Sequence, residues 1–306
     1  QLLVGPISGA GLSLLRPLLE ARQVPLIATT AGANLPREAA PSPYIFRHTL
    51  GLWQTSLAAG AWAAASLGRR AFVAASAHDS GFDAIDAFQL GFEQGGGAIA
   101  GLGISHRPGA PDSLPELMAA IAAARPALVY AAYAGAQADE FLRAYAGAGL
   151  AGRIPLVGAG LLADGAAPDA ALPELTSALS WTPALDGPAA RALRAELPQT
   201  TGRPADAFAA LGYDTGLLIA ATSGAGRALR DSLAAARVTG ARGALSLDQR
   251  SGYVSSPLYL SSTSWAGAAR RDALAAELPP TPALLERAAP LLSAPKTGWL
   301  NAYLCI

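Results

Sequence analysis

The sequence predicts an α/β fold in which parallel strands are flanked by helices on both faces. Short apolar runs alternate with longer amphipathic runs along most of the chain, which is the rhythm of successive strand–helix units. Hydrophobic residues make up 52% of the 306 residues and charged residues only 14%, so a sizeable core can form. No long Pro- or Gly-rich linker separates independent domains.

The first half of the chain carries the clearest strand–helix alternation. The segment 44–47 follows Pro43, which favours extended geometry in its neighbour. The stretch 49–68 carries no charge and is about long enough to span a bilayer, but its small residues favour a helix buried within the protein. The predicted strands here are 1–4, 24–28, 44–47, 70–75, 98–104, 127–132 and 154–157, and the predicted helices are 11–22, 54–67, 81–94, 114–124 and 136–148.

The second half is predicted to be more helical. Helices are expected at 188–197, 205–223 and 228–237, and strands at 243–247 and 257–261. From Ser264 onward the composition predicts two short helices and then an apolar run over 298–306.

Charge and motif content exclude several classes of protein. The 22 basic and 22 acidic residues give a net charge of +0, which argues against nucleic acid or an anionic membrane as a partner. The single cysteine, Cys305, allows no internal disulfide, and three histidines without metal spacing indicate no metal or other cofactor. No nucleophile elbow is present, and the G-x-G-x-x-G at 147–152 lies after a predicted helix and before a strand, the reverse of a dinucleotide site. We therefore expect no catalytic residues and no enzyme activity.

A series of short landmarks occurs in a fixed order between residue 2 and about residue 262. The most distinctive are the turn at 4–10 (VGPISGA), the strand and loop at 24–31 (VPLIATTA) and the crossing at 43–47 (PYIFR). Together they resemble type I periplasmic binding proteins, and most of all the leucine/isoleucine/valine-binding proteins of ABC transporters. The other landmarks are 127–133, 141–150, 155–158, 208–214 and 240–252.

The resemblance implies two α/β lobes joined by a hinge, with parallel sheets flanked by helices. It places lobe 1 at 1–47 and 184–255, lobe 2 at 48–183 and a hinge crossing at 256–263. The family normally has a strand–helix–strand–helix segment before the first landmark, and lobe 1 is expected to lack it here. The tail 264–306, with 298–306 as a strand, is a candidate to complete lobe 1; alternatively the sequence is a truncated product.

The resemblance also implies a ligand site in the cleft between the lobes. The N–H groups of Thr30, Ala31 and Gly32, with the Thr30 hydroxyl, can hold a carboxylate in a small nest. Ser8 and Gly9, at the start of the first long helix, would add a hydroxyl and helix N-terminal N–H groups. The alternative is that all five residues are ordinary caps and turns.

Further residues are expected to line this cleft. Tyr133 follows a strand at its carboxyl end, where open α/β sheets place ligands. Trp53 and Phe208 are candidate aromatic walls, although a core position is the favoured interpretation for each. Ser80, which also caps a helix start, is a candidate for the cleft face.

The resemblance departs from the family on the amine side of the ligand. Amino-acid-binding members carry an acidic residue that holds the ligand ammonium after a lobe 2 strand, where this chain has Ala159 and Gly160. A tyrosine of that site is matched by Ser80. Because a buried ammonium without a carboxylate is costly, we expect a ligand that lacks an α-amine or anchors it differently.

The function expected from the resemblance is capture of a small carboxylate outside the cytoplasm. The ligand is expected to be an aromatic, keto or branched aliphatic acid, with an amino acid still open, and the partner an ABC transporter membrane permease. The protein is expected to be periplasmic, with no signal peptide in this sequence, and to be a monomer or a weak dimer. Two alternatives stay open: a ligand sensor on the same fold, and a degenerate paralogue that binds a protein partner.

Overall fold

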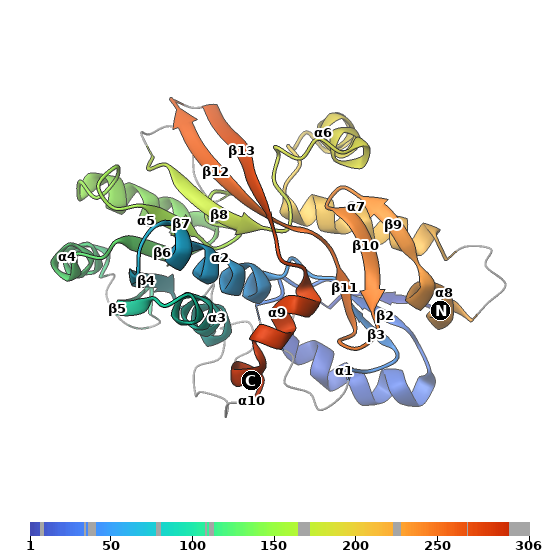
Figure 1. Cartoon of the computed structure of the whole chain (residues 1–306). Coiled ribbons are helices and arrows are strands. Elements are labelled where there is room, and N and C mark those ends of the chain that lie inside the picture. Colours follow the sequence, from blue (N-terminus) through green and yellow to red (C-terminus); the bar gives the residue numbers. More distant parts are fainter. Residues whose placement is uncertain are drawn as a thin grey trace.

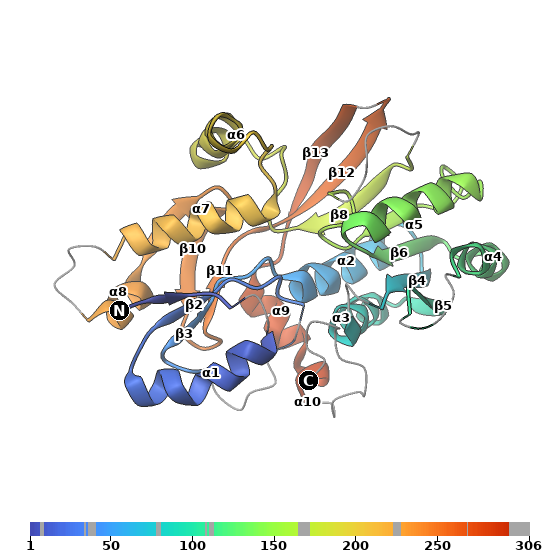
Figure 2. The same ribbon diagram turned by 180° about the vertical axis from the view of Figure 1, so that it is seen from behind.

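The computed structural model describes residues 1–6, 9–33, 35, 41–77, 81–107, 109, 113–164, 172–222, 228–267 and 269–293. Within these residues the strands form two sheets, one of six strands and one of seven, which lie side by side (Figures 1 and 2). The chain passes between the sheets near the centre of the molecule (Figure 1). The predicted α/β class is confirmed, although both sheets are mixed, because antiparallel strands extend each parallel part.

The first sheet has the order β1-β2-β3-β11-β10-β9. Neighbours from β1 to β11 are parallel, and β11, β10 and β9 are antiparallel. On one face Leu12 and Leu19 of α1 pack on Leu26 and Ile45, and on the other Leu233 of α8 packs on the alternate residues of β2 and β3. The bounds are β1 Leu3–Val4, β2 Leu26–Ala28, β3 Ile45–Arg47, β9 Arg237–Gly240, β10 Gly243–Asp248, β11 Tyr253–Ser255, α1 Gly9–Arg22, α6 Pro188–Thr201, α7 Ala207–Ala220 and α8 Leu229–Ala235.

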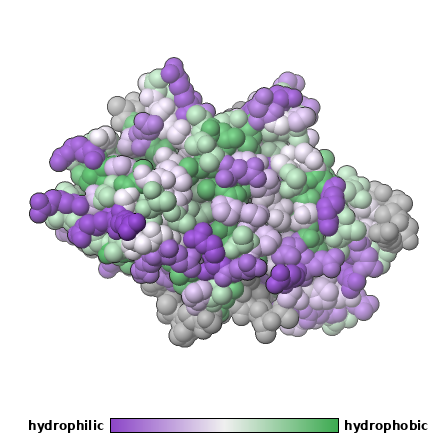
Figure 3. All heavy atoms as spheres, viewed as in Figure 1, coloured by the Kyte–Doolittle hydropathy of each residue, from purple (hydrophilic) through white to green (hydrophobic). Residues whose placement is uncertain are grey.

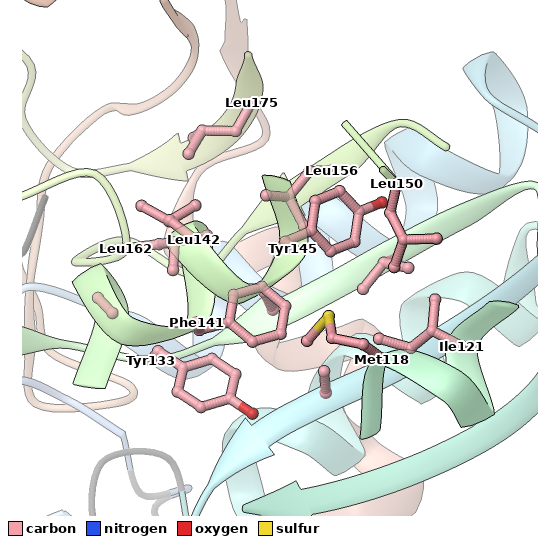
Figure 4. Packing of buried hydrophobic residues seen from close by; sticks show 14 of the residues in the cluster. Met118, Ile121, Tyr133, Phe141, Leu142, Tyr145, Leu150, Leu156, Leu162 and Leu175 are labelled. Atoms are coloured by element: carbon pink, nitrogen blue, oxygen red, sulfur yellow. The ribbon is translucent and has the colours of Figure 1, made fainter. Parts of the chain in front are cut away.

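The second sheet has the order β13-β12-β8-β7-β6-β4-β5. Strands from β8 to β5 are parallel and almost entirely apolar, as expected of strands covered on both faces. Helices α2 and α3 cover one face, and α4 and α5 cover the other, where Tyr133, Phe141 and Tyr145 pack closely (Figure 4). The bounds are β4 Arg70–Ser76, β5 Ala98–Ser105, β6 Leu128–Ala132, β7 Leu156–Gly158, β8 Leu175–Leu179, β12 Leu258–Ala266, β13 Ala269–Leu278, α2 Leu52–Ser66, α3 Gly81–Gln94, α4 Leu114–Ala124 and α5 Gly135–Gly147.

The structure of the segment after Ser264 differs from the prediction. We expected two short helices there, but β12 continues to Ala266 and β13 occupies 269–278; the two short helices, α9 (Thr281–Arg287) and α10 (Ala289–Ser293), follow later. The Ala-, Leu-, Arg- and Glu-rich composition of β13 favours a helix locally, and pairing with β12 along its length overrides that preference. The described part of the tail up to Leu278 therefore lies in the second sheet, while the run 298–306 is outside the described residues.

The uncharged stretch 49–68 contains α2, and most residues of this helix are buried. This confirms the prediction of a buried helix. Among the described residues, no helix is both long and apolar enough to cross a membrane. Hydrophobic residues gather on one face of the surface between the β12–β13 hairpin and α6, among hydrophilic ones (Figure 3).

Candidate functional site

The carboxyl ends of several parallel strands meet near the centre of the molecule. In the first sheet β2 ends at Ala28 and β3 at Arg47, and in the second sheet β7 ends at Gly158. The chain crosses from the first sheet to the second directly after β3 (Figure 1). This is the region where open α/β sheets place their ligands, and it contains several of the predicted site residues.

The predicted loop Thr30–Gly32 is tied to the beginning of α2. The amides of Leu52 and Trp53 donate to the carbonyls of Ala31 and Gly32 at 3.2 and 3.0 Å. The amide of Leu50 donates to the carbonyl of Thr30 at 3.2 Å. The bonds from Leu52 and Trp53 satisfy N–H groups at the N-terminus of α2 that have no partner inside the helix, and the bond from Leu50 adds a contact just before it, so the loop and the crossing segment form one unit.

Gly32 is required by the geometry of this unit. Its φ is +73°, and a Cβ at this position would lie 2.6 Å from Thr49 Oγ1. Its N–H donates to the Thr30 hydroxyl oxygen at 3.2 Å, so that donor is used inside the loop. Within the part of the chain that the structure describes, the N–H groups of Thr30 and Ala31 have no hydrogen-bond partner.

Gly160 of the second sheet approaches the same unit. It follows β7, and a Cβ at this position would lie 3.1 Å from Leu52 Cδ2. The structure therefore brings the loop after β2 and the loop after β7 to Leu52, and their contact with a ligand stays a prediction. Neither Ala159 nor Gly160 supplies a charge.

Three aromatic residues of the prediction lie in other settings. Tyr133 is buried against α5, with its ring stacked on Phe141 at 4.4 Å and its hydroxyl 2.9 Å from Ser105 Oγ (Figure 4). Trp53 is fully buried and its Nε1 donates to the Tyr253 hydroxyl at 3.4 Å. Both positions favour the core interpretation. Phe208 is 51% exposed on α7, and its role as a ligand wall stays a prediction.

Of the remaining predicted residues, only Gly9 lies within the described residues. Gly9 is the first residue of α1, as expected for the start of that helix. Ser8 and Ser80 lie outside the described residues. Among the residues that are described, no group of three or more His, Cys, Asp or Glu side chains is placed to hold a metal ion.

A buried ion pair beside the crossing was not predicted. Arg242 and Asp214 are both fully buried, and Arg242 Nε donates to Asp214 Oδ2 at 3.0 Å. The amide of Ala241 donates to Asp214 Oδ1 at 2.6 Å. Both residues lie in landmarks that the sequence revealed, at 208–214 and 240–252, but no local pattern indicates that they pair.

Arg242 also holds the crossing segment. Its Nη1 donates to the carbonyl of Thr49 at 2.8 Å, and its Nη2 contacts His48 Nε2. The Tyr259 hydroxyl donates to the Arg242 carbonyl at 3.0 Å. Burial, and then the charge of Arg242, hold the pKa of His48 well below its usual range, and burial raises the pKa of Tyr259 to about 12.

Comparison with known proteins identifies relatives of this architecture. A family model described as periplasmic binding protein matches residues 1–278. A solute-binding protein of an ABC transporter from R. palustris, in complex with benzoate, is 25% identical with a TM-score of 0.74; the match covers 91% of this chain and 78% of that chain. No curated protein matches.

Two further solved structures are similar. The solute-binding protein of an ABC transporter from Rhodopseudomonas palustris BisB5, in complex with 3,4-dihydroxybenzoic acid, is 25% identical with a TM-score of 0.72, over 86% of this chain and 74% of that chain. An ABC transporter substrate-binding protein from Sphaerobacter thermophilus is 26% identical with a TM-score of 0.78, over 91% of this chain and 79% of that chain.

Proposed function

This chain belongs to the periplasmic binding protein family, and we propose that it captures a small aromatic carboxylate and delivers it to an ABC transporter permease. Delivery to a permease implies that the chain works outside the cytoplasm, in the periplasm. The predicted lobes, 1–47 with 184–255 and 48–183, are proposed to close around the ligand by a hinge motion. A keto or branched aliphatic acid would use the same carboxylate contacts.

The observation that carries this proposal is the loop Thr30–Gly32 at the start of α2. Its main chain is held rigidly by the amides of Leu50, Leu52 and Trp53, while the N–H groups of Thr30 and Ala31 are left without partners in the described residues. Adjacent main-chain N–H groups with a fixed direction suit a carboxylate, because charge-assisted hydrogen bonds to an anion are strong. Gly160 lies close to Leu52, so the loop after β7 approaches the start of α2 beside this loop.

The aromatic class is supported by chemistry and by relatives. Two similar solute-binding proteins hold benzoate and 3,4-dihydroxybenzoic acid, which are carboxylates without an α-amine. In this chain Ala159 and Gly160 stand where amino-acid-binding members carry the acidic partner of the ammonium. An α-amino acid would therefore bury its ammonium without a charge partner, at a large energetic cost.

The test is a thermal-shift and calorimetry series on the purified chain with benzoate, 3,4-dihydroxybenzoate, methyl benzoate and leucine. A ligand that binds only the folded state stabilises it by about 2.7 kcal/mol at a hundredfold excess over Kd. We expect the two acids to raise the melting temperature, and the ester, which lacks a carboxylate charge, to leave it unchanged.

Two results would contradict the proposal. If leucine gives a larger shift than benzoate, the ammonium has a partner that the loop after β7 does not supply. If no acid binds and the chain associates with a protein instead, the alternative of a partner-binding paralogue is favoured.

A further inference from the structure

A fully buried network of polar groups joins the crossing after β3 to α7 and to the turn between β9 and β10. Its members are His48 in the crossing, Asp214 on α7 and Arg242 in the turn between β9 and β10. Arg242 uses all three guanidinium nitrogens: Nε on Asp214 at 3.0 Å, Nη1 on the Thr49 carbonyl at 2.8 Å, and Nη2 on His48 Nε2. One buried cation thus holds the crossing segment in place.

The hydrogen-bond directions require His48 to be neutral. A guanidinium only donates, so His48 Nε2 must accept from Arg242 and carries no proton. The proton is then on Nδ1, which donates to Thr215 Oγ1 at 3.0 Å, and the Thr215 hydroxyl donates to the carbonyl of Leu211 at 2.7 Å. A proton added to Nε2 would place an N–H and a positive charge directly against Arg242.

The charged and titratable groups described around His48 do not offset the positive charge that protonation of its ring would add. Arg242 faces it from the β9–β10 turn, and Asp214 on α7 is already bound by Arg242 and by the amide of Ala241. Tyr259 of β12 donates to the Arg242 carbonyl, and the guanidinium of neighbouring Arg47 lies over the Tyr253 ring. Within the described residues Asp214 is the carboxylate of this network. Burial and the charge of Arg242 accordingly keep the pKa of His48 low.

The network is connected to the proposed carboxylate loop through Thr49. Its carbonyl is bound by Arg242, and its hydroxyl accepts from the amide of Gly51 at 3.2 Å. The same hydroxyl lies so close to Gly32 that no Cβ would fit between them. A shift of Thr49 therefore moves the surface on which the loop rests.

We propose that Arg242 and His48 are positioning residues for the loop Thr30–Gly32, and that protonation of His48 in acid releases this loop and weakens ligand capture. The effect on the loop follows from the network alone. The effect on a ligand rests on the proposed function, because it requires that the loop binds a carboxylate. Capture would then be strong near neutral pH and weak in acid.

The first test measures amide hydrogen exchange of the unliganded full chain between pH 8 and pH 5, corrected for the intrinsic pH dependence of exchange. The reporters are the amides of Leu50, Leu52 and Trp53, which donate to the loop. In the wild type we expect their protection to fall by up to about tenfold per pH unit between the ordinary histidine pKa of about 6.5 and the lower native pKa of His48, and to level off below it. His48→Gln should show no such loss, because an amide oxygen can accept from Arg242 and does not titrate.

The matched control is His106→Gln. His106 lies at the end of β5, near Ser105 and Glu140 and away from the network, so this variant should lose protection as the wild type does. Equal losses in His48→Gln and the wild type would overturn the proposal. If His48→Gln does not fold, the wild type decides: the loss of protection must level off at the NMR titration midpoint of the His48 ring, and a loss that continues or ends at another pH rejects the proposal.

The second test measures the Kd of benzoate by calorimetry over the same pH range. We expect Kd to rise about tenfold per pH unit below the native pKa of His48 in the wild type, and to stay constant in His48→Gln. A parallel rise in both would contradict the proposal. Should benzoate bind at no pH, the proposed function fails while the exchange experiment still decides whether the network positions the loop.

Discussion

The main chain of Gly91 in α3 lies directly against the carbonyl of Leu57 in α2, so that a Cβ on Gly91 would be 2.1 Å from that oxygen. The same contact recurs at Gly60, where a Cβ would lie 2.2 Å from the carbonyl of Phe88. Glycine at these two positions lets the backbones of α2 and α3 touch, and α2 begins at the proposed ligand loop.

We therefore expect Gly91→Ala to lower the free energy of unfolding by about 1–3 kcal/mol or more, because the helices must move apart. The control is Gly216→Ala in α7, where nothing lies within 4 Å of the added Cβ. That change should raise stability by about 0.5–1 kcal/mol, as alanine favours a helix over glycine. Urea unfolding measures both, and equal stabilities would show that the helices do not touch as described.

Gly32→Ala should weaken carboxylate binding at least tenfold. The substitution combines an unfavourable positive φ with a Cβ 2.6 Å from Thr49 Oγ1, so the loop must leave the crossing segment. Gly135→Ala is the matched control, because Gly135 has φ +55° and open space around its Cβ position. Calorimetry with benzoate should give at least a tenfold loss of affinity for the first variant and none for the second.

Tyr133→Phe discriminates between a core tyrosine and a ligand contact. The hydroxyl lies 2.9 Å from Ser105 Oγ in a buried setting, so its removal should cost about 1 kcal/mol of stability. Affinity for benzoate should stay at the wild-type value, because the ring faces Phe141 and not the crossing. A loss of affinity larger than tenfold without a loss of stability would restore Tyr133 to the site.

The pair Arg242–Asp214 should show strong coupling. Arg242→Leu alone leaves a buried carboxylate without its cation and is expected to destabilise the chain by about 3–5 kcal/mol. The double variant with Asp214→Leu should be less destabilised than the sum of the two single variants. Chemical unfolding of the four chains measures the coupling, and strict additivity would contradict the described contact.

Stability should decline in mild acid because of His48. Above about pH 7.5 the histidine is neutral in both the folded and the unfolded chain, so it makes no difference to stability. Below about pH 6.5 the unfolded chain binds a proton that the native chain excludes, so stability falls by up to about 1.4 kcal/mol per pH unit. The fall ends once the pH passes the native pKa.

Urea unfolding between pH 8 and pH 5 measures this slope. His48→Gln should reduce it, whereas His106→Gln should retain the part due to His48. A slope that is identical in the wild type and His48→Gln would assign the acid sensitivity to other groups.

The family resemblance, more than any local pattern, predicted the candidate site, and the contact of its residues with a ligand stays a prediction. The turn chemistry at Thr30–Gly32 and the small residue Gly160 were predicted from the sequence, and the structure brings both to Leu52. The orientation of Tyr133 and Trp53 was not predicted, because a residue at the end of a strand or the start of a helix can face either side. Only the packing of α5 and of Tyr253 decides that both are buried.

The sequence by itself determined the alternation of strands and helices, the small, uncharged character of α2 and the family to which the chain belongs, because periodicity, turn residues and ordered landmarks are properties of near neighbours. Only the tertiary structure decided that the helix-favouring segment 269–278 is a strand and that Arg242 reaches Thr49, 193 positions away. Such pairings depend on how every element packs. Their energies come from contacts between distant segments, which no local pattern encodes.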